Sequence, residues 1–102
     1  MEKVKALNLI GIAYRAKKII NGYESVMATV TSGKAKCVIV ASDASSKTIE
    51  AFSKKCYFYH VPMYMDFNTD EISKAIGKGL CKVICLTDDG FNKSLNKLLS
   101  EV

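Results

Sequence analysis

The stretch that decides the fold is Ala35-Lys-Cys-Val-Ile-Val-Ala41, an almost continuous run of apolar and β-branched residues. It lacks the alternation of a half-exposed strand, and it is typical of a strand covered on both faces. Ser32-Gly33 ends a helical pattern before it, and Asp43 opens another after it. The run therefore predicts a central strand in an α/β fold.

A helix and a short strand are expected at the N-terminal side. Over residues 2–16, apolar residues recur at the spacing of one helical face. That face contains Val4, Leu7, Gly11 and Tyr14. The strand is expected at 18–20, and it leads into Asn21-Gly22, a dipeptide typical of a turn.

A second helix is expected to begin at this dipeptide. Asn21 is a good N-cap residue, and Glu24 stands three residues later, as in a capping box. The buried side is expected to consist of Val26, Met27 and Val30. Ser32-Gly33 is expected to end the helix.

Two more helices and a strand are expected after the central run. Asp43 is expected to cap a helix near residue 45, with Ile49, Phe52 and Cys56 on its inner side. The aromatic segment 57–67 contains Pro62, near which a short strand is expected to begin. Asn68 and Glu71 have capping-box spacing for a helix that ends at Gly77.

The last two elements are a strand at 82–87 and a helix. The apolar face of this helix consists of Phe91, Leu95, Leu98, Leu99 and Val102. The order α–β–α–β–α–β–α–β–α predicts a three-layer αβα sandwich around a four-stranded mixed, mainly parallel sheet. Ligands of such sheets usually bind near strand ends and helix N-termini.

Length and composition indicate one globular domain over residues 1–102. Apolar residues make up 49% of the sequence and charged residues 25%, which is the balance of a folded protein. Fifteen Lys and Arg against ten Asp and Glu give a net charge of +5, which favours a polyanionic partner. We find no apolar stretch near 20 residues and no leader cleavage site, so we expect a cytoplasmic protein that does not enter a membrane.

The four cysteines are expected to be buried, reduced thiols. They are Cys37, Cys56, Cys81 and Cys85. A zinc site needs paired short spacings, whereas Cys81 and Cys85 with the lone His60 supply one loose pair. We therefore expect no metal.

Catalytic chemistry is not expected either. His60 is the only histidine, and it is interpreted as a turn residue. The acidic pairs Asp70-Glu71 and Asp88-Asp89 stand where helices are expected to begin, which capping and helix-dipole roles explain. Gly77-x-Gly79 lacks the further residues of a phosphate-binding loop. We therefore expect that the protein is not an enzyme and that it binds no cofactor and no small-molecule substrate.

Several segments together resemble one family over almost the whole chain. They are Asn8 to Lys18, Gly22, Ser32 to Lys36, Val38 to Ser45, Lys55 to Pro62, Ile72 to Gly77 and Asp89 to Phe91. Their order and spacing are similar to those of the kink-turn-binding large-subunit ribosomal protein superfamily, and within it to the small bacterial YlxQ-type members. The resemblance implies an αβα sandwich that binds structured RNA without a cofactor.

The resemblance also implies a site made of three pieces. These are the start of the second helix at 21–28, the loop after the central strand at Asp43, and the loop 77–80. Where the family helix has Asn, Glu and Lys, this chain has Glu24, Ser25 and Ala28. Ser73 likewise replaces a usual glycine.

Elementary electrostatics adds lysines to these pieces. Amides at a helix start can receive a phosphate, and lysines supply charge if the fold brings them together. The full set of candidate RNA-binding residues is Lys18, Asn21, Gly22, Glu24, Ser25, Lys34, Lys36, Asp43, Lys78, Gly79 and Leu80, with Lys17 beside them.

Two functions are expected from these features. The first is an RNA-binding accessory protein of the ribosome or of RNA processing, with ribosomal or RNA-processing proteins as further partners. The alternative is a protein-interaction module that docks through exposed Tyr23, Phe58 or Tyr64. A clustered lysine surface favours the first function, and an exposed apolar patch favours the second.

Overall fold

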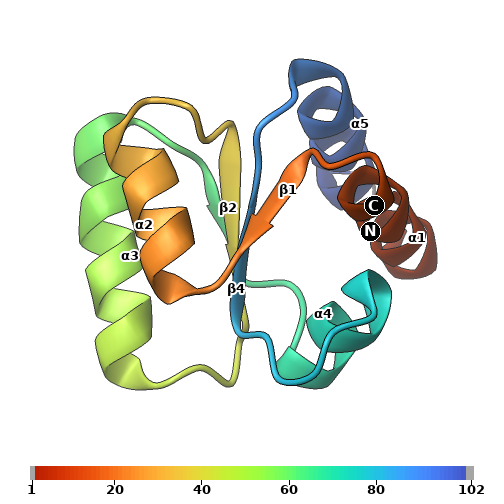
Figure 1. The fold of residues 1–102 in the computed structure, drawn as a ribbon, viewed down its shortest axis with the longest axis horizontal. Coiled ribbons are helices and arrows are strands. Elements are labelled where there is room, and N and C mark those ends of the chain that lie inside the picture. Colours follow the sequence, from red (N-terminus) through yellow and green to blue (C-terminus); the bar gives the residue numbers. More distant parts are fainter. Residues whose placement is uncertain (1, 101–102) are drawn as a thin grey trace.

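The computed structural model describes residues 2–100, and its helices and strands alternate along the chain (Figure 1). The elements are α1 (Lys3–Arg15), β1 (Ile19–Asn21), α2 (Tyr23–Thr31), β2 (Cys37–Val40), α3 (Ser46–Tyr59), β3 (Met63–Tyr64), α4 (Thr69–Ile76), β4 (Val83–Leu86) and α5 (Asp89–Ser100). The expected order of elements is confirmed. Val102, which was expected on the face of the last helix, lies outside the described residues.

The helices cover both faces of the sheet, as the sandwich prediction requires. Figure 1 shows α2 and α3 on one face and α1, α4 and α5 on the other. Every residue of β2 and of β4 is buried. The central position expected for the run 35–41 is therefore confirmed.

The expected predominance of parallel pairing is wrong. The strand order is β1-β4-β2-β3, and β4 is antiparallel to both β1 and β2. Among the strands of residues 2–100, only β2 and β3 pair in parallel. A strand buried on both faces has the same sequence pattern in either direction, so the pattern does not predict how β4 runs between its neighbours.

Two helices differ from the sequence interpretation, α1 in its buried face and α3 in its length. The buried residues of α1 are Ala6, Ile10, Gly11 and Ala13, which confirms Gly11, whereas Val4, expected on that side, is 73% exposed. The aromatic residues 57–59 belong to the last turn of α3, which His60 ends in the left-handed conformation with φ 59°. A left-handed residue after a helix closes its last turn.

The four cysteines are buried and unpaired, as expected. Burial raises the pKa of the Cys37 thiol to about 12 and that of Cys85 to about 11. The three or more close His, Cys, Asp or Glu side chains that a metal ion needs are not found within residues 2–100. No helix in that range is both long and apolar enough to cross a membrane.

The two ends of the sheet carry different parts of the candidate site. At one end, here called the Gly22 end, β1 and β2 finish and β4 begins, and the Gly22 N–H donates to the carbonyl of Val83. At the other, the Lys36 end, the Lys36 N–H donates to the carbonyl of Leu86. In Figure 1 the Gly22 end is at the bottom and the Lys36 end at the top.

Candidate functional site

The chain turns from β1 into α2 through Gly22. Asn21 is the last residue of β1 and pairs with Ile84, so the predicted Asn21 cap is wrong: Gly22 occupies the N-cap position. The dihedral angles of Gly22 are φ 98° and ψ 147°, a region that is essentially restricted to glycine. A Cβ atom at this position would have no other atom within 4 Å, so the backbone conformation requires glycine and packing does not.

The start of α2 has no side-chain cap, unlike the starts of α3 and α4. Because the first intrahelical bond runs from the Val26 N–H to the Gly22 carbonyl, the amides of residues 23–25 precede it and point out of the helix. The expected capping box with Glu24 is not formed. Free amides at a helix start bind anions, and the helix dipole adds to the attraction.

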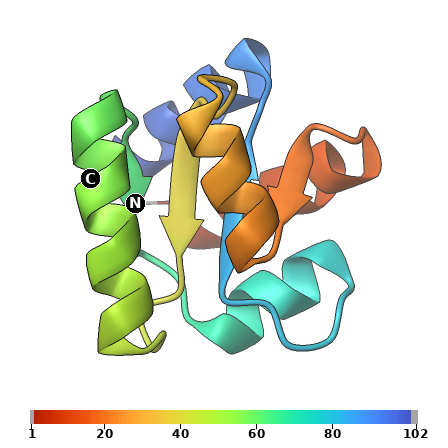
Figure 2. The ribbon, with the colours of Figure 1, turned by 60° about the vertical axis from the view of Figure 1, so that its left-hand side comes forward.

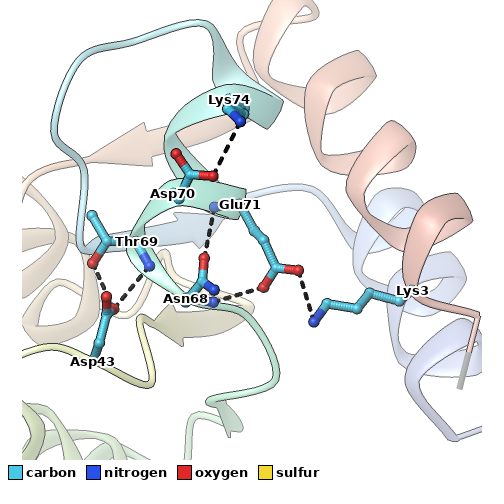
Figure 3. Close-up of polar contacts among 7 residues, drawn as sticks. All are labelled: Lys3, Asp43, Asn68, Thr69, Asp70, Glu71 and Lys74. Atoms are coloured by element: carbon cyan, nitrogen blue, oxygen red, sulfur yellow. Dashed lines mark hydrogen bonds and ion pairs between the residues drawn. The ribbon is translucent and has the colours of Figure 1, made fainter.

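Asp43 binds α4 and does not cap α3. Its Oδ1 accepts hydrogen bonds from the Thr69 N–H at 2.8 Å and the Thr69 hydroxyl at 2.7 Å (Figure 3). These bonds, first the one from the hydroxyl, lower the pKa of the Asp43 carboxyl. Ser45 caps α3 instead, because its hydroxyl accepts from the Thr48 N–H. The prediction that Asp43 caps α3 is therefore wrong.

The predicted capping box of α4 is present. The Asn68 side chain accepts from the Glu71 N–H, and a carboxylate oxygen of Glu71 accepts from the Asn68 N–H, both at 2.9 Å (Figure 3). The other oxygen of Glu71 lies 2.7 Å from Lys3 Nζ in α1. Lys3, and then the Asn68 amide, lower the pKa of Glu71. The start of α4 is thus bonded to Asp43 in the loop after β2 and to Lys3 of α1.

The loop 77–80 is closed by a side chain that the sequence interpretation did not assign to the site. The buried Ser73 hydroxyl accepts from the Cys81 N–H at 2.9 Å and donates to the Cys81 carbonyl at 3.4 Å. Gly77 ends α4 with φ 69°, and Leu80, at the tip, is 82% exposed. Lys78 Nζ lies 5.9 Å from the centre of the Tyr14 ring. In the sequence, the hydrogen bond between Ser73 and Cys81 is indicated only by Ser73 standing where the family usually has glycine.

Leu80 joins two hollows at the Gly22 end. One has a volume of about 240 Å³ and is lined by Asn21, Gly22, Tyr23, Thr48, Leu80, Cys81, Lys82 and Val83. The other, of about 460 Å³, is lined by Asp43, Thr69, Asp70, Ser73, Lys74, Lys78, Gly79 and Leu80. Together they connect six predicted site residues, and the exposed Glu24 and Ser25 follow in the first turn of α2.

The remaining predicted lysines lie at the Lys36 end. The Lys18 carbonyl accepts from the Thr87 N–H, and the N–H of Lys36, the residue before β2, donates to the Leu86 carbonyl. Lys34 lines a hollow together with Lys36 and Thr87. Strands rise about 3.4 Å per residue, so Lys82 and Thr87 at the two ends of β4 are about 17 Å apart. The structure therefore divides the predicted set into two groups.

The sequence interpretation missed several polar residues of the Gly22 end. Lys82 is exposed beside this end of β4, and its charge contributes to the low pKa of Asp43. Thr48 of α3 lines the smaller hollow. Neither residue has a sequence signal, because each lies next to Gly22 or Asp43 only after the chain folds.

Comparison with known proteins places the chain in a family. Residues 5–96 match the model of the ribosomal protein L7Ae/L30e/S12e/Gadd45 family. This chain belongs to that family. The resemblance inferred from the sequence is thereby confirmed.

Two curated relatives are similar over most of their length. One is the RNA-binding protein YlxQ of Enterococcus faecium, with 43% identity over 95 residues, which are 93% of this chain and 91% of the relative. The other is the RNA-binding protein YlxQ of Bacillus subtilis (strain 168), with 35% identity over 91 residues, which are 89% and 91% of the two chains.

Two solved structures share the fold of this family member. A protein of unknown function from Bacillus halodurans superposes with a TM-score of 0.91 and 36% identity, covering 95% of this chain and 98% of the other. The Giardia lamblia 15.5kD RNA binding protein superposes with a TM-score of 0.83 and 20% identity, covering 97% and 86%. The second likeness concerns the fold alone. Both superpositions agree with the αβα sandwich described above.

Proposed function

We propose that this family member is an RNA-binding accessory protein of the ribosome or of RNA processing, which binds structured, kink-turn-like RNA through the start of α2 and the adjacent loops. Its curated relatives are named RNA-binding proteins. The observation that carries the proposal is the uncapped start of α2 at Gly22, next to the exposed Leu80.

The backbone of the Gly22 end suits a phosphate. The amides of residues 23–25 have no acceptor in their own helix, and the dipole of α2 is positive there. Because Gly22 has no side chain, a phosphate oxygen can approach the amides closely. A phosphate bound in this way is held by geometry, and it needs few lysines.

The side chains around the smaller hollow suit an unpaired base. Leu80 and Tyr23, 82% and 45% exposed, provide apolar surface beside the free amides. The Asn21 amide can both donate to and accept from a base edge. Bases that leave a helix are typically recognised by such a combination of stacking surface and polar edge contacts.

Glu24 and Ser25 set this chain apart from the motif that the resemblance implies. Both side chains are exposed in the first turn of α2. Ser25 can hydrogen-bond a base edge, whereas the Glu24 carboxylate accepts and cannot donate. We therefore propose that α2 contributes mainly its amides, and that Asn21 and Ser25 make the base contacts.

A titration tests the proposal. The full chain is titrated with a kink-turn RNA and with an unrelated hairpin of equal length at several salt concentrations. We expect the kink-turn RNA to bind more tightly at every salt concentration, because backbone geometry and base contacts survive salt. Equal affinity for both RNAs with a steep salt slope contradicts the proposal, because that result indicates only electrostatic attraction.

We further propose that the protein acts as one domain in the cytoplasm, without catalysis or a cofactor. The four unpaired cysteines are consistent with a reducing compartment. Ribosomal or RNA-processing proteins are its expected neighbours. Sedimentation of the protein together with ribosomal particles, if RNase treatment abolishes it, supports this role. Sedimentation of the protein as a free species, apart from those particles, contradicts it.

A further inference from the structure

The Lys36 end carries positive charge that the proposed kink-turn contact does not use. Lys34 and Lys36 line one hollow there, and the carbonyl of Lys18, which follows Lys17 in the chain, accepts from the Thr87 N–H. Lys34 forms no ion pair within residues 2–100, and Lys36 Nζ lies 3.5 Å from Asp89 in an exposed pair. Exposed pairs of this kind are worth about 0–1 kcal/mol, so a phosphate can displace Asp89.

A hollow of about 440 Å³ opens between these lysines. It is lined by Ile20, Thr29, Gly33, Lys34, Lys36 and Thr87. Its other donors are occupied: the Thr29 hydroxyl donates to the Ser25 carbonyl, and the Thr87 hydroxyl donates to that of Lys18.

The backbone amides of this hollow are occupied as well. The N–H groups of Gly33, Lys34 and Lys36 donate to the carbonyls of Val30, Thr29 and Leu86. The remaining donors within residues 2–100 are therefore the ammonium groups of the two lysines, of which that of Lys36 is in the exposed pair with Asp89. Point charges without a fixed cradle attract the phosphates of a polymer and do not select a small anion by its shape.

Exposed aromatic rings stand at the same end of the molecule. Tyr57 and Phe58, in the last turn of α3, are 86% and 71% exposed. The Val38 N–H donates to the Pro62 carbonyl, which places the turn after α3 beside the start of β2. Figures 1 and 2 both show the C-terminal ends of α2 and α3 at the Lys36 end.

The other aromatic side chains expected to dock a protein, Tyr64 and Tyr23, already contact side chains of this protein. Tyr64 donates from its hydroxyl to Asn96 Oδ1 at 2.6 Å. Tyr23 packs edge-on against Phe52, with ring centres 5.0 Å apart. Tyr57 and Phe58 are thus the most exposed rings within residues 2–100, although Phe58 packs edge-on against Tyr59 with ring centres 5.0 Å apart. Lys54 and Lys55 precede them by one helical turn.

The charges around the rings favour a nucleic acid as the occupant. The C-terminal ends of α2 and α3 carry negative partial charge, which repels phosphates from the rings themselves. Lys54 and Lys55 beside the rings, and Lys34 and Lys36 at the same end of the sheet, attract phosphates. Bases over aromatic rings, with phosphates on nearby lysines, are the arrangement by which proteins bind single strands.

We propose that the Lys36 end binds a short single-stranded segment of RNA, with bases stacked on Tyr57 and Phe58 and phosphates held by Lys34 and Lys36. This inference rests on the proposed function only in taking RNA as the ligand. Its site is separate from the Gly22 end.

A fluorescent single strand tests this surface directly. The full chain is titrated with an unstructured RNA octamer that contains 2-aminopurine. We expect stacking to quench the fluorescence. Because a stacked base contributes about 1–3 kcal/mol, Tyr57→Ala with Phe58→Ala should weaken binding about tenfold or more. Lys34→Gln with Lys36→Gln should reduce the salt slope by about 1.4.

Matched controls separate these effects from general changes of the surface. Val4→Ala removes an exposed apolar side chain of α1, and Lys97→Gln removes an exposed charge of α5. Neither should change the affinity for the octamer. Thermal unfolding checks that every variant is folded.

The outcomes distinguish this inference from the proposed function. Absence of quenching, or unchanged binding by the aromatic variant, overturns the inference and leaves Tyr57 and Phe58 as a protein-docking patch. If the protein binds the octamer but binds the kink-turn RNA no more tightly than the unrelated hairpin, the inference is supported and the proposed kink-turn contact is contradicted. Octamer binding that weakens equally in the control variants overturns the inference, because the surface then acts only through its overall composition.

Discussion

The two ends of the sheet present anion-binding groups of different kinds. At the Gly22 end the free donors include backbone amides of residues 23–25, fixed by a helix and a glycine, with the exposed Lys78 and Lys82 beside them. At the Lys36 end the amides of residues 33, 34 and 36 are occupied, and the free donors are flexible lysines. Fixed amides select a ligand by geometry, whereas lysines attract any polyanion. Net charge therefore does not locate the more selective end.

The largest expected effect comes from Gly22→Asp. The strained backbone conformation should cost about 1–3 kcal/mol of stability, and the carboxylate should repel phosphate. We expect urea denaturation to show the loss of stability, and a titration with structured RNA to show at least tenfold weaker binding. Gly22→Ala introduces the backbone strain without the charge, so a comparison of the two variants separates the effect of strain from that of the carboxylate.

Gly33→Ala is the matched control at the other end. Gly33 also has a positive φ, of 79°, and open space where a Cβ atom would stand. We expect a loss of stability of about 1 kcal/mol with unchanged affinity for structured RNA. If the Gly33 and Gly22 variants weaken that affinity equally, the distinction between the two ends fails.

Ser73→Ala is expected to have the next largest effect. It leaves the buried Cys81 N–H without its acceptor, which costs about 1–3 kcal/mol. We expect faster amide hydrogen exchange at Cys81 and weaker binding of structured RNA. Binding of the single-stranded octamer should not change, because the loop 77–80 belongs to the Gly22 end. Unchanged exchange at Cys81 would show that the hydroxyl does not hold the loop.

Acid should weaken the fold through Asp43 and Glu71. The folded state lowers the pKa of Asp43 and of Glu71, so their stabilising contribution is complete above their ordinary pKa of about 4. It is lost as the pH falls below that value and through the lowered pKa. Denaturation at pH 7 and pH 3 should show a smaller difference in the Asp43→Asn, Glu71→Gln variant than in the wild type. An equal difference contradicts this assignment.

The smallest effect on stability is expected from Lys34→Gln with Lys36→Gln. The ion pair of Lys36 with Asp89 is exposed, and Lys34 makes none within the described residues. We expect the free energy of unfolding to change by less than about 0.5 kcal/mol. A loss above 1 kcal/mol would mean that these lysines support the fold.

Two identical sequence signals had opposite outcomes. Asn21 with Glu24, and Asn68 with Glu71, both have the spacing of a capping box. The second pair forms it. The first does not, because Asn21 pairs with Ile84 in the sheet and Gly22 takes the N-cap position. Asp43 was likewise assigned to the nearer helix, but it bonds to Thr69, 26 residues away.

The sequence by itself determined the order of the elements, the buried central strand and the family, because periodicity, caps and motifs depend on neighbouring residues. Ser32-Gly33 and the α4 capping box were correctly located for that reason. Only the tertiary structure decided that β4 runs antiparallel between β1 and β2. That direction places Lys82 at the Gly22 end and Thr87 at the Lys36 end. Lys34 and Lys36 are therefore separated from the free amides by the length of a strand, a distance that no local pattern encodes.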